Sequence, residues 1–594
     1  MRHIIYILLF AFINTSAQQS EKFSGKVVDK ETKQPLAFCN IRISGTHTGT
    51  ITNEQGVFVL HYNNSSDIIE FSYIGYKQER LDINTILQKP QIELEKEIST
   101  LNEFSVVAED DFLYEIVAKC RKSILTNKAQ LQSKVYYRVE SFSSKTPIEI
   151  LECYYNAQLD GLTTNDLIYK NGRTAQAPSD GNYFNTYNTS QALTQLNLAN
   201  DNGYFPKLPT QLSKRKAQNL FKLFLANQNQ ESFCIEFSPI VNDGTYFSGK
   251  LWIQKKTWQL LKIEMEVPLA TTHPFLPQHQ TDKVFDVSMK IIQQFTTYGN
   301  VLVPDYTTFQ YQLKYHSVRD SNMSIPQELS RIITRSISSK GIIEYYDYGK
   351  PFLIPFFDYP SNLYYGDYYK MTFIPYDSIF WAYNTQMLLT SNQLHNINQI
   401  KKNGNLINHN PSYAQGYENK SRFEFHYSFW SPNKRVFLKR DIKQFEQYND
   451  KIINQSIRSE LYQIKVQILL NASNISDSIV CRTYTVFDTY NSFFHLPHDM
   501  HIYGILNIYF DLCEIERLRL DSIISTEKPN FIEISKLHQN STQRIEQLGE
   551  QFFREVKLGE NRKALEKWNR IVFEKLGIDN LALVEATIKY QENK

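Results

Sequence analysis

The sequence predicts a multidomain α+β protein in which β-strands predominate. Its 594 residues, 42% of them hydrophobic, are enough to form several buried cores, and we expect roughly three or four domains. Up to about residue 496, short runs of alternating apolar and polar residues separated by turn residues are typical of antiparallel sheets. From Pro497 onward the apolar positions repeat with the spacing of a helix, so the C-terminal region is expected to be helical.

The charges of the chain nearly cancel. Lys and Arg together number 64, and Asp and Glu together number 62. A protein that binds nucleic acid normally carries a clear excess of positive charge on the binding surface. The composition therefore argues against a nucleic-acid partner.

The first residues have the layout of a secretory signal peptide. Arg2 precedes the apolar run Ile4–Ile13, and the small residue Ala17 follows a short polar stretch. The apolar run is too short to cross a hydrocarbon layer of about 30 Å as a helix. We therefore expect residues 1–17 to be removed and the mature protein to be exported to the periplasm, the outer membrane or the cell surface. The alternative is a buried N-terminal helix.

No later stretch of the sequence is apolar enough to predict a transmembrane helix. The most apolar stretch, Ile502–Cys513, contains Asn507 and Asp511, so it predicts a buried helix. Association with a membrane by other means stays open. The six cysteines are widely scattered and form no Cys-x-x-Cys pair, which argues against a disulfide framework and a zinc knuckle: Cys39, Cys120, Cys153, Cys234, Cys481 and Cys513.

The region from Phe23 to Leu94 predicts a small antiparallel sandwich. Short β-type runs alternate there with turn residues. Asn53 and Gly56 suit a turn, because the Asn side chain can bond to the backbone and Gly tolerates a positive φ. The expected strands are Phe23–Val28, Ala37–Ile43, Gly56–His61, Ile68–Tyr73 and Gln91–Leu94.

The motifs of this region resemble the carboxypeptidase-like regulatory domain. The residues that carry the resemblance are Gly25–Asp29, Gln34–Ala37, Ile41–Thr46, Gly49–Phe58 and Phe71–Lys77. The resemblance implies a seven-stranded sandwich at residues 23–97, of the kind found at the N-terminus of envelope proteins of Gram-negative bacteria, including TonB-dependent importers. Asn53 stands where the family commonly has Asp. None of the histidines begins a His-x-x-Glu pair, so the zinc site of a carboxypeptidase is not expected.

The segment Ile98–Ala108 is similar to the linker that leads into the plug domain of importers. No plug follows, however, because Asp110 and Asp111 open an amphipathic helix. Its apolar face is formed by Leu113, Ile116, Val117, Cys120 and Ile124. This argues against a complete importer, and the rest of the chain resembles uncharacterised envelope proteins that carry the same module.

Residues 134–349 predict a curved antiparallel domain with an inserted helix at Ser213–Ala226. Long strands are expected at Val284–Phe295 and Thr307–Tyr315, with a turn at Gly299. The architecture resembles the half-barrel of periplasmic lipoprotein carriers, whose concave face holds acyl chains. Five apolar residues would then either line a pocket or pack against the helix: Leu251, Ile253, Leu261, Ile263 and Met265.

Pairs of aromatic residues offer a further binding hypothesis for this part of the chain. Tyr345 with Tyr346, Phe356 with Phe357, and Tyr364 with Tyr365 could stack on sugars or peptides. The chain has 38 Tyr and 38 Phe, so abundance alone explains most such pairs. An apolar or glycan ligand therefore stays open beside a protein partner.

The second half predicts another sheet followed by helices. One short helix with Leu394, Ile397 and Ile400 is expected to end at Asn403 and Gly404. Strands are expected around Phe423–Phe429 and Tyr462–Ile468, and a helix over Asp499–Ile524. Two more helices are marked by Ile545, Leu548, Phe552 and Val556 and by Leu565, Trp568, Val572 and Leu576, with stops at Gly559 and Gly577.

The whole chain is thus divided into six predicted segments. They are a signal peptide at 1–17, the regulatory-type sandwich at 23–97, a linker and helix at 98–133, the curved β domain at 134–349, a second β domain at 350–496 and a helical region at 497–594.

Three neighbouring histidines form the strongest candidate for chemistry. His495, His498 and His501 lie close together in sequence, with Asp499 between them. Pro497 favours the first turn of a helix, so His498 and His501 become neighbours on one face and could share a zinc ion with His495. The alternative is that these histidines cap the helix and fill a polar junction. Asp511 and Glu514 lie too far along the helix to join the same ion.

We interpret the sequence as an exported, non-enzymatic protein of the cell envelope that acts in binding, docking or assembly. No catalytic or cofactor-binding residue is predicted, and no cofactor is expected apart from the zinc alternative. Two other functions stay open. One is a metal-dependent hydrolase that uses His495, His498 and His501, and the other is an accessory protein of a TonB-dependent importer.

Overall fold

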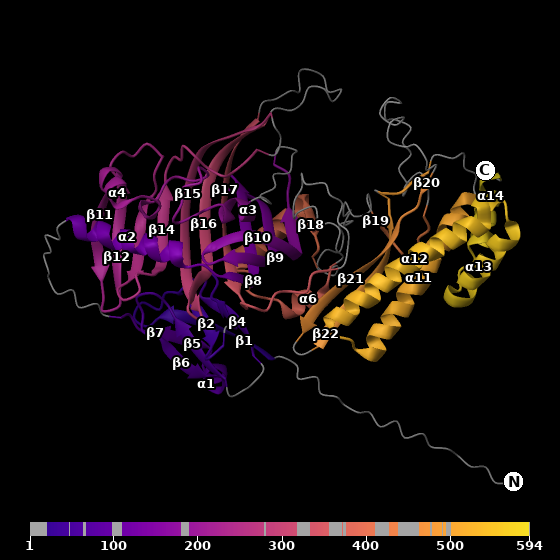
Figure 1. Cartoon of the computed structure of the whole chain (residues 1–594), viewed down its shortest axis with the longest axis horizontal. Coiled ribbons are helices and arrows are strands. Elements are labelled where there is room, and N and C mark those ends of the chain that lie inside the picture. Colours follow the sequence, from indigo (N-terminus) through magenta and orange to yellow (C-terminus); the bar gives the residue numbers. More distant parts are fainter. Residues whose placement is uncertain are drawn as a thin grey trace, which may run out of the picture. The chain divides into compact units, whose positions relative to one another are not determined.

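The computed structural model describes most of the chain in two compact units (Figure 1). The first unit contains Met1–Ile98, Asn384–Thr390 and Ile475–Ser478, and the second contains Ser99–Tyr383, Ser391–Asn474 and Ile479–Lys594. Within them the described residues are 21–46, 48–62, 67–97, 110–179, 189–277, 281–317, 333–355, 371, 376–409, 427–436, 462–475, 478–489, 491–494 and 501–592.

The first unit contains the seven-stranded sandwich that the sequence predicts. One sheet has the order β4 (Val57–Tyr62), β1 (Glu21–Asp29), β7 (Gln91–Leu94), and the other has the order β3 (Gly49–Ile51), β2 (Asn40–Ile43), β5 (Ile68–Ser72), β6 (Glu79–Asp82). Phe58 of the first sheet packs edge-on against Phe71 of the second, with ring centroids 5.8 Å apart. The sandwich prediction is confirmed.

Three short elements of this unit have little signal in the sequence. Strands β3 and β6 and helix α1 (Ile83–Gln88) were not expected. Strand β6 reads Glu-Arg-Leu-Asp and pairs with β5, so its place in the sheet stabilises a segment of low β-propensity. Helix α1 begins where the Asp82 side chain accepts a hydrogen bond from the backbone N–H of Thr85.

The predicted turn before β4 is confirmed. The Oδ1 atom of Asn53 accepts hydrogen bonds from the backbone N–H groups of Gln55 (3.0 Å) and Val57 (2.9 Å). Gly56 has a φ of +74°, and a Cβ atom there would lie 2.6 Å from the carbonyl oxygen of Val27. The turn therefore needs both the short polar side chain and the glycine.

The second unit is built on an antiparallel sheet of eleven strands. Its order is β11 (Phe221–Gln228), β12 (Ser232–Pro239), β13 (Ser248–Gln254), β14 (Leu260–Val267), β15 (Lys283–Tyr298), β16 (Val301–Ser317), β17 (Ile333–Tyr346), β8 (Gln130–Ser143), β9 (Thr146–Asp160), β10 (Thr163–Gln176) and β18 (Asn405–Ile407). Most neighbours in this order are also neighbours in sequence, as expected for a meander.

Helix α2 (Asp110–Thr126) crosses one face of this sheet, which we call the inner face (Figure 1). Leu113, Ile116, Val117 and Cys120 are buried in the same core as the sheet residues Leu251, Ile253, Ile263 and Met265. The core-packing interpretation of these four sheet residues is therefore confirmed, although the helix that contributes most to their core is α2 and not the predicted helix at Ser213–Ala226. The prediction for Leu261 was wrong: a register shift between Trp252 and Ile253 places Leu260 in the core instead.

The predicted helix at Ser213–Ala226 is only half correct. Helix α4 covers Lys214–Leu220, and the following residues form β11. Leu223 is buried while Phe224 is 56% exposed, which is the alternation of a strand. Pairing with β12 therefore overrides the helical pattern of the sequence.

Two helices lie on the other face of the sheet, which we call the outer face. Helix α7 (Ser391–Asn403) lies against β9, β10 and β18, and α6 (Ser378–Tyr383) precedes it. The end of α7 at Asn403 was predicted. Ile397 and Ile400 are buried as expected, whereas Leu394 is 44% exposed.

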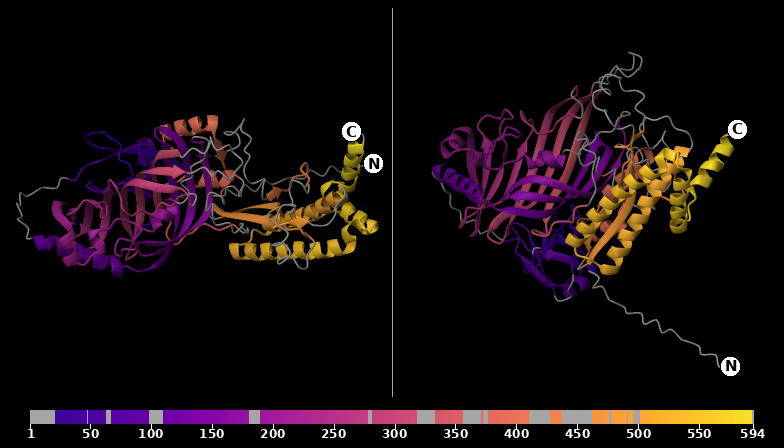
Figure 2. Two further views of the ribbon diagram at one scale, coloured as in Figure 1. Left: turned by 90° about the horizontal axis from the view of Figure 1, so that it is seen from above. Right: turned by 45° about the vertical axis from the view of Figure 1, so that its right-hand side comes forward.

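The C-terminal part of the second unit combines small sheets with four helices (Figure 2). One sheet has the order β19 (Tyr427–Phe429), β22 (Ser478–Asp488), β21 (Val466–Ile475), and β20 (Tyr462–Gln463) pairs with β23 (Phe493–Phe494). The helices are α11 (His501–Glu527), α12 (Phe531–Val556), α13 (Arg562–Leu576) and α14 (Asn580–Glu592). Val466 and Phe487 of the sheet share a core with Ile505, Phe552 and Trp568 of the helices, which confirms the predicted packing. Helix α14 was not predicted.

Within the described ranges, no helix is both long enough and apolar enough to cross a membrane. All six cysteines lie in described residues, and all six are free thiols.

Candidate functional site

The predicted histidine cluster lies mostly outside the described residues. His495 and His498 are not among them, and neither is Asp499. His501 is the first residue of α11 and is exposed. Among the described residues, no three His, Cys, Asp or Glu side chains are grouped so that they could hold a metal ion. The zinc site therefore stays a prediction.

The two acidic residues further along α11 hold the helix in place. Asp511 is fully buried, and it accepts hydrogen bonds from Trp430 Nε1 (2.7 Å), from Arg435 Nη1 (2.9 Å) and from Asn580 Nδ2 (2.7 Å). Glu514 accepts a hydrogen bond from Thr485 Oγ1 (2.6 Å) and forms an ion pair with Arg517 (2.7 Å). Both side chains thus have structural partners, consistent with their exclusion from the histidine site.

A group of buried and half-buried charged side chains lies on the outer face of β8, β9 and β10. We call this group the charged layer. Strand β9 is buried on both faces for most of its length, because helix α7 lies against its outer face. The residues of the charged layer are Arg138, Glu140, Glu152, Lys170 and Arg173.

Lys170 is the most enclosed cation of the charged layer. Its side chain is fully buried, and Nζ donates hydrogen bonds of 2.7 Å to the carbonyl oxygens of Leu353 and Ala472 and to Oδ1 of Asn471. Burial lowers the pKa of this amine to about 7, although the charge of Asp377 opposes the shift. Lys170 therefore joins β10 of the large sheet to β21 and titrates near neutral pH.

Asp377 completes the surroundings of Lys170. Its Oδ1 accepts hydrogen bonds from the backbone N–H groups of Ile379 (3.1 Å) and Phe380 (3.0 Å) at the start of α6, and Asn471 Nδ2 donates to its Oδ2 (3.2 Å). Arg482 lies 3.4 Å from the same carboxylate. The carboxylate caps a helix and orients the Asn471 side chain that accepts from Lys170.

A second polar group surrounds Glu152. Arg173 Nε donates to one carboxylate oxygen (2.6 Å) and the Tyr136 hydroxyl donates to the other (2.7 Å). Burial alone would raise the pKa of Glu152, but Arg173 and Tyr136 outweigh it and the pKa is lowered. The guanidinium of Arg173 also lies 4.1 Å from the centre of the Trp381 ring. The carboxylate is thus held ionised by its partners.

His409 lies close to this group and stays neutral. It is buried, and burial together with the charge of Arg173 lowers its pKa to about 3. A neutral imidazole and a paired carboxylate resemble parts of an acid–base site. However, the Glu152 oxygens and the Lys170 amine already have close protein partners, so these groups stabilise the contact between the sheet and the segments that cover it.

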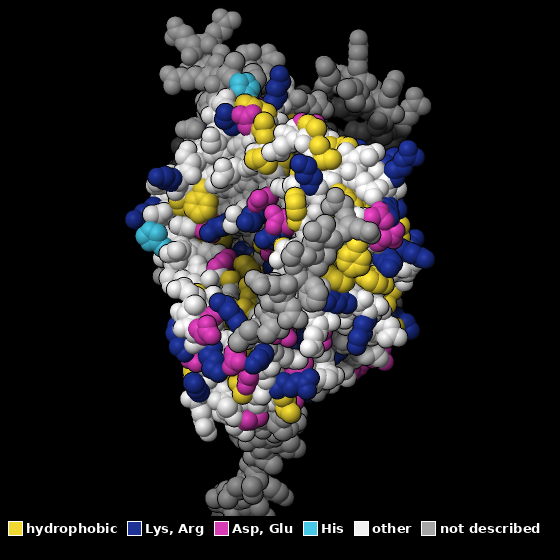
Figure 3. All heavy atoms as spheres, turned by 90° about the vertical axis from the view of Figure 1, so that its left-hand side faces the viewer, with side chains coloured by type: hydrophobic (Ala, Val, Ile, Leu, Met, Phe, Trp, Pro, Cys, Tyr) yellow, Lys and Arg dark blue, Asp and Glu magenta, His cyan; other side chains and the backbone are white. Residues whose placement is uncertain are grey.

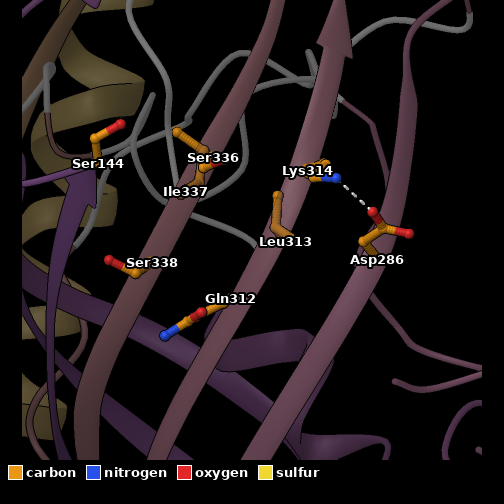
Figure 4. A pocket seen from close by; sticks show the side chains of 8 residues that line it. All are labelled: Ser144, Asp286, Gln312, Leu313, Lys314, Ser336, Ile337 and Ser338. Atoms are coloured by element: carbon orange, nitrogen blue, oxygen red, sulfur yellow. Dashed lines mark ion pairs between the residues drawn. The ribbon is translucent and has the colours of Figure 1, made fainter. Parts of the chain in front are cut away.

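Two depressions lie on the exposed part of the outer face, over β13–β17. A depression of about 230 Å³ is lined by Ser144, Asp286, Gln312, Leu313, Lys314, Ser336, Ile337 and Ser338 (Figure 4). Lys314 points toward Asp286 and forms an ion pair of 2.8 Å. A neighbouring depression of about 480 Å³ shares Gln312 and extends to Glu266 and Lys290. Most of the lining residues are polar or charged, which suits a hydrated ligand better than an acyl chain.

The remaining surface and the aromatic pairs give no sharper site. Figure 3 shows basic and acidic side chains interspersed over the face that it draws, in keeping with the balance of charges in the sequence. Tyr345 is buried, and its hydroxyl bonds to Thr164, so it does not offer a free ring to a sugar. Phe356, Phe357, Tyr364 and Tyr365 lie outside the described residues.

The charged layer was missed from the sequence, although one signal was present. Lys170 and Arg173 fall inside a strand, and Glu152 falls among apolar and aromatic residues of another. Charged residues at such positions are typical either of a solvated strand face or of a second covered face. Only the position of α6 and α7 decides between the two.

Comparison with known proteins identifies the first part of the chain. The family model of the CarboxypepD_reg-like domain matches residues 23–106. Residues 23–106 form a CarboxypepD_reg-like domain. The resemblance that the motifs predicted is thereby confirmed, and the domain contributes the sandwich of the first unit. A comparison of the chain with curated proteins gives no match.

Several solved structures are similar to part of the chain. A LolA superfamily protein from Nitrosomonas europaea is 12% identical, with 43% of this chain and 97% of that chain covered and a TM-score of 0.16. A putative outer membrane lipoprotein-sorting protein domain from Vibrio parahaemolyticus is 9% identical, with 43% and 97% covered and a TM-score of 0.18. The MucA/MucB complex of Pseudomonas aeruginosa gives 7% identity, 38% and 92% coverage and a TM-score of 0.12.

Proposed function

We propose that this protein is an exported, non-enzymatic component of the cell envelope that binds or docks another envelope component. The N-terminal CarboxypepD_reg-like domain supports the proposal, because modules that resemble it are found in envelope proteins. The signal-like start of the sequence supports export. The buried side chains with catalytic potential, Lys170 and Glu152, have structural partners, which favours a binding role over catalysis.

One observation carries the docking role: the sandwich already binds the segment Asn384–Thr390 of its own unit. The hydroxyl of Thr50 donates to the carbonyl oxygen of Gln386 (2.9 Å), and the Gln386 side chain donates to the carbonyl oxygen of Gly49 (3.2 Å). Asn53 Nδ2 donates to the carbonyl oxygen of Leu388 (3.2 Å). The edge of the module at β3 is therefore suited to binding a peptide backbone.

The departure of Asn53 from the family pattern fits this docking role. Its Oδ1 atom serves the turn, as an Asp carboxylate would, but its Nδ2 atom donates to the docked segment. An ionised carboxylate has no proton to donate there. The Asn53 amide thus both stabilises the turn and binds the segment Asn384–Thr390.

Native mass spectrometry of the mature protein, purified from its own envelope, tests the proposed function. We expect a complex whose excess mass corresponds to another envelope protein or to a defined non-protein envelope ligand. An increment of one metal ion would instead support the hydrolase that uses His495, His498 and His501. A bare chain at every protein concentration would contradict the docking role.

A further inference from the structure

A group of exposed apolar side chains lies at one end of the large sheet. Ile240 and Val241 follow β12 and are 48% and 63% exposed, and Leu269 follows β14 and is 57% exposed. Strands β12 and β14 both flank β13 and run in the same direction, so the two loops lie at the same end. We call Ile240, Val241 and Leu269 the apolar tip.

Hydrogen bonds hold the two loops of the apolar tip together. The backbone N–H of Thr271 donates to the carbonyl oxygen of Gly244 (3.1 Å), and the backbone N–H of Ile240 donates to the carbonyl oxygen of Leu220 at the end of α4 (2.9 Å). A third segment joins them, because Lys207 N–H donates to the carbonyl oxygen of Thr245 (2.9 Å). The loops that carry the exposed side chains are therefore held in place by backbone hydrogen bonds.

Two further exposed apolar residues belong to the same segments. Tyr204 is 50% exposed and lies three residues before the Lys207 contact, and Leu276 is 76% exposed and follows Leu269 on the β14–β15 connection. An amphipathic Tyr among exposed aliphatic side chains is typical of a surface that meets the boundary between lipid headgroups and acyl chains.

The charges beside the apolar tip favour an anionic partner. Arg215 and Lys216 on α4 and Lys222 on β11 are exposed, and α4 and the start of β11 adjoin the end of β12. Lys207 is paired with Asp201 (3.0 Å), and Lys214 is shared by two acids, Asp111 (2.7 Å) and Glu115 (2.5 Å). The loop acid Asp243 accepts a hydrogen bond from the backbone of Thr245 (2.9 Å). Asp243 and Glu266 are exposed acids beside the tip, so the positive charge is local: Arg215, Lys216 and Lys222 belong to α4 and the start of β11, at one side of the tip.

From this juxtaposition we infer that the apolar tip docks on an anionic lipid surface. The aliphatic side chains enter the outer part of the bilayer while Arg215, Lys216 and Lys222 contact the headgroups. Such binding is peripheral and needs no spanning helix. The inference goes beyond the proposed docking role and does not depend on it, because it uses the second unit alone, whereas the peptide-binding edge belongs to the first.

Vesicle flotation of the full mature chain tests this inference. We expect the protein to float with vesicles of phosphatidylcholine plus phosphatidylglycerol and much less with phosphatidylcholine alone. The double variant Val241→Ser/Leu269→Ser should lower the partition coefficient about tenfold or more, because two aliphatic side chains that would enter the bilayer are lost. Lys216→Gln and Lys222→Gln should each lower it roughly fivefold, and added salt should weaken their effect.

A matched double variant controls for the loss of any exposed aliphatic residue. Ile532→Ser/Leu583→Ser removes side chains that are 68% and 48% exposed on α12 and α14, and it should leave flotation unchanged. Both double variants should retain the thermal unfolding curve of the parent. A parent chain that does not float, a control that loses as much binding as the tip variant, or a tip variant that only converts a dimer to a monomer would overturn the inference.

Discussion

The two faces of the large sheet are both buried around β8, β9 and β10, but they are built differently. The inner face packs apolar residues such as Leu151 and Cys153 into one core with helix α2. The outer face carries the charged layer, which contains Glu152 and Lys170 and is covered by α6, α7 and part of β21. Apolar packing is non-directional, whereas buried charges need particular partners, so the charged layer fixes how the covering segments are placed.

The largest effect is expected where the outer face loses a charge. Glu152→Leu removes the acceptor of Arg173 and Tyr136 in a buried site, and we expect the free energy of unfolding to fall by about 3–5 kcal/mol. Glu152→Gln keeps the shape of the side chain and one acceptor oxygen, so the free energy of unfolding should fall by less than in Glu152→Leu. Chemical denaturation of the three chains measures both differences, and equal stability of Glu152→Leu and the parent would show that the layer is dispensable.

The second largest effect is a pH dependence of stability, which we expect from Lys170 on the outer face and not from the apolar inner face. Lys170 has a pKa of about 7 in the folded protein and 10.5 as its ordinary value, so between these values the unfolded chain binds more protons. The contribution of Lys170 to the free energy of unfolding therefore rises with pH from about 7 upward, by at most about 1.4 kcal/mol per pH unit. Denaturation of the parent and of Lys170→Met at pH 7, 8 and 9 isolates this slope.

Lys170→Met supplies its own control, because all other titrating groups are common to both chains. We expect the stability difference between the chains to change with pH over this range. The difference should be largest at pH 9, where the amine of the parent is neutral. In the variant, the acceptors on Leu353, Asn471 and Ala472 have lost the Lys170 donor. A difference that stays constant from pH 7 to pH 9 would contradict the assignment of a pKa near 7.

The contrast between the faces also explains what the sequence could predict. The inner face follows from alternation, because Leu251 and Ile253 on β13 are two residues apart, as are Ile263 and Met265 on β14, and all four face one core. The outer face does not, because Lys170 finds its acceptors on residues 353, 471 and 472, far away in sequence. The local sequence pattern also gave a wrong prediction at β11, where pairing with β12 forms a strand in a segment that was predicted to be helical. The histidine cluster His495, His498 and His501 stays a prediction.

A smaller effect is expected from trimming the inner face. Ile263→Val removes one methylene from the core under α2, and we expect the free energy of unfolding to fall by about 1 kcal/mol. Since no charge is involved, the cost should be the same from pH 7 to pH 9. Denaturation at these pH values measures it, and a cost that varies with pH would show that the two faces are coupled.

The most local effect is expected in the first unit, where a single amide distinguishes turn formation from segment binding. Asn53→Asp keeps the acceptor for Gln55 and Val57 but loses the donor to Leu388. We expect faster hydrogen exchange in Asn384–Thr390 and a loss of global stability of about 1 kcal/mol, because the hydrogen bond is lost and the buried carboxylate faces the Leu388 carbonyl oxygen without a donor. Gln55→Glu introduces the same charge at an exposed neighbour and should leave exchange in that segment unchanged. If both variants accelerate exchange equally, charge near the turn and not the Asn53 amide governs the segment; if neither does, the segment is held by its other contacts.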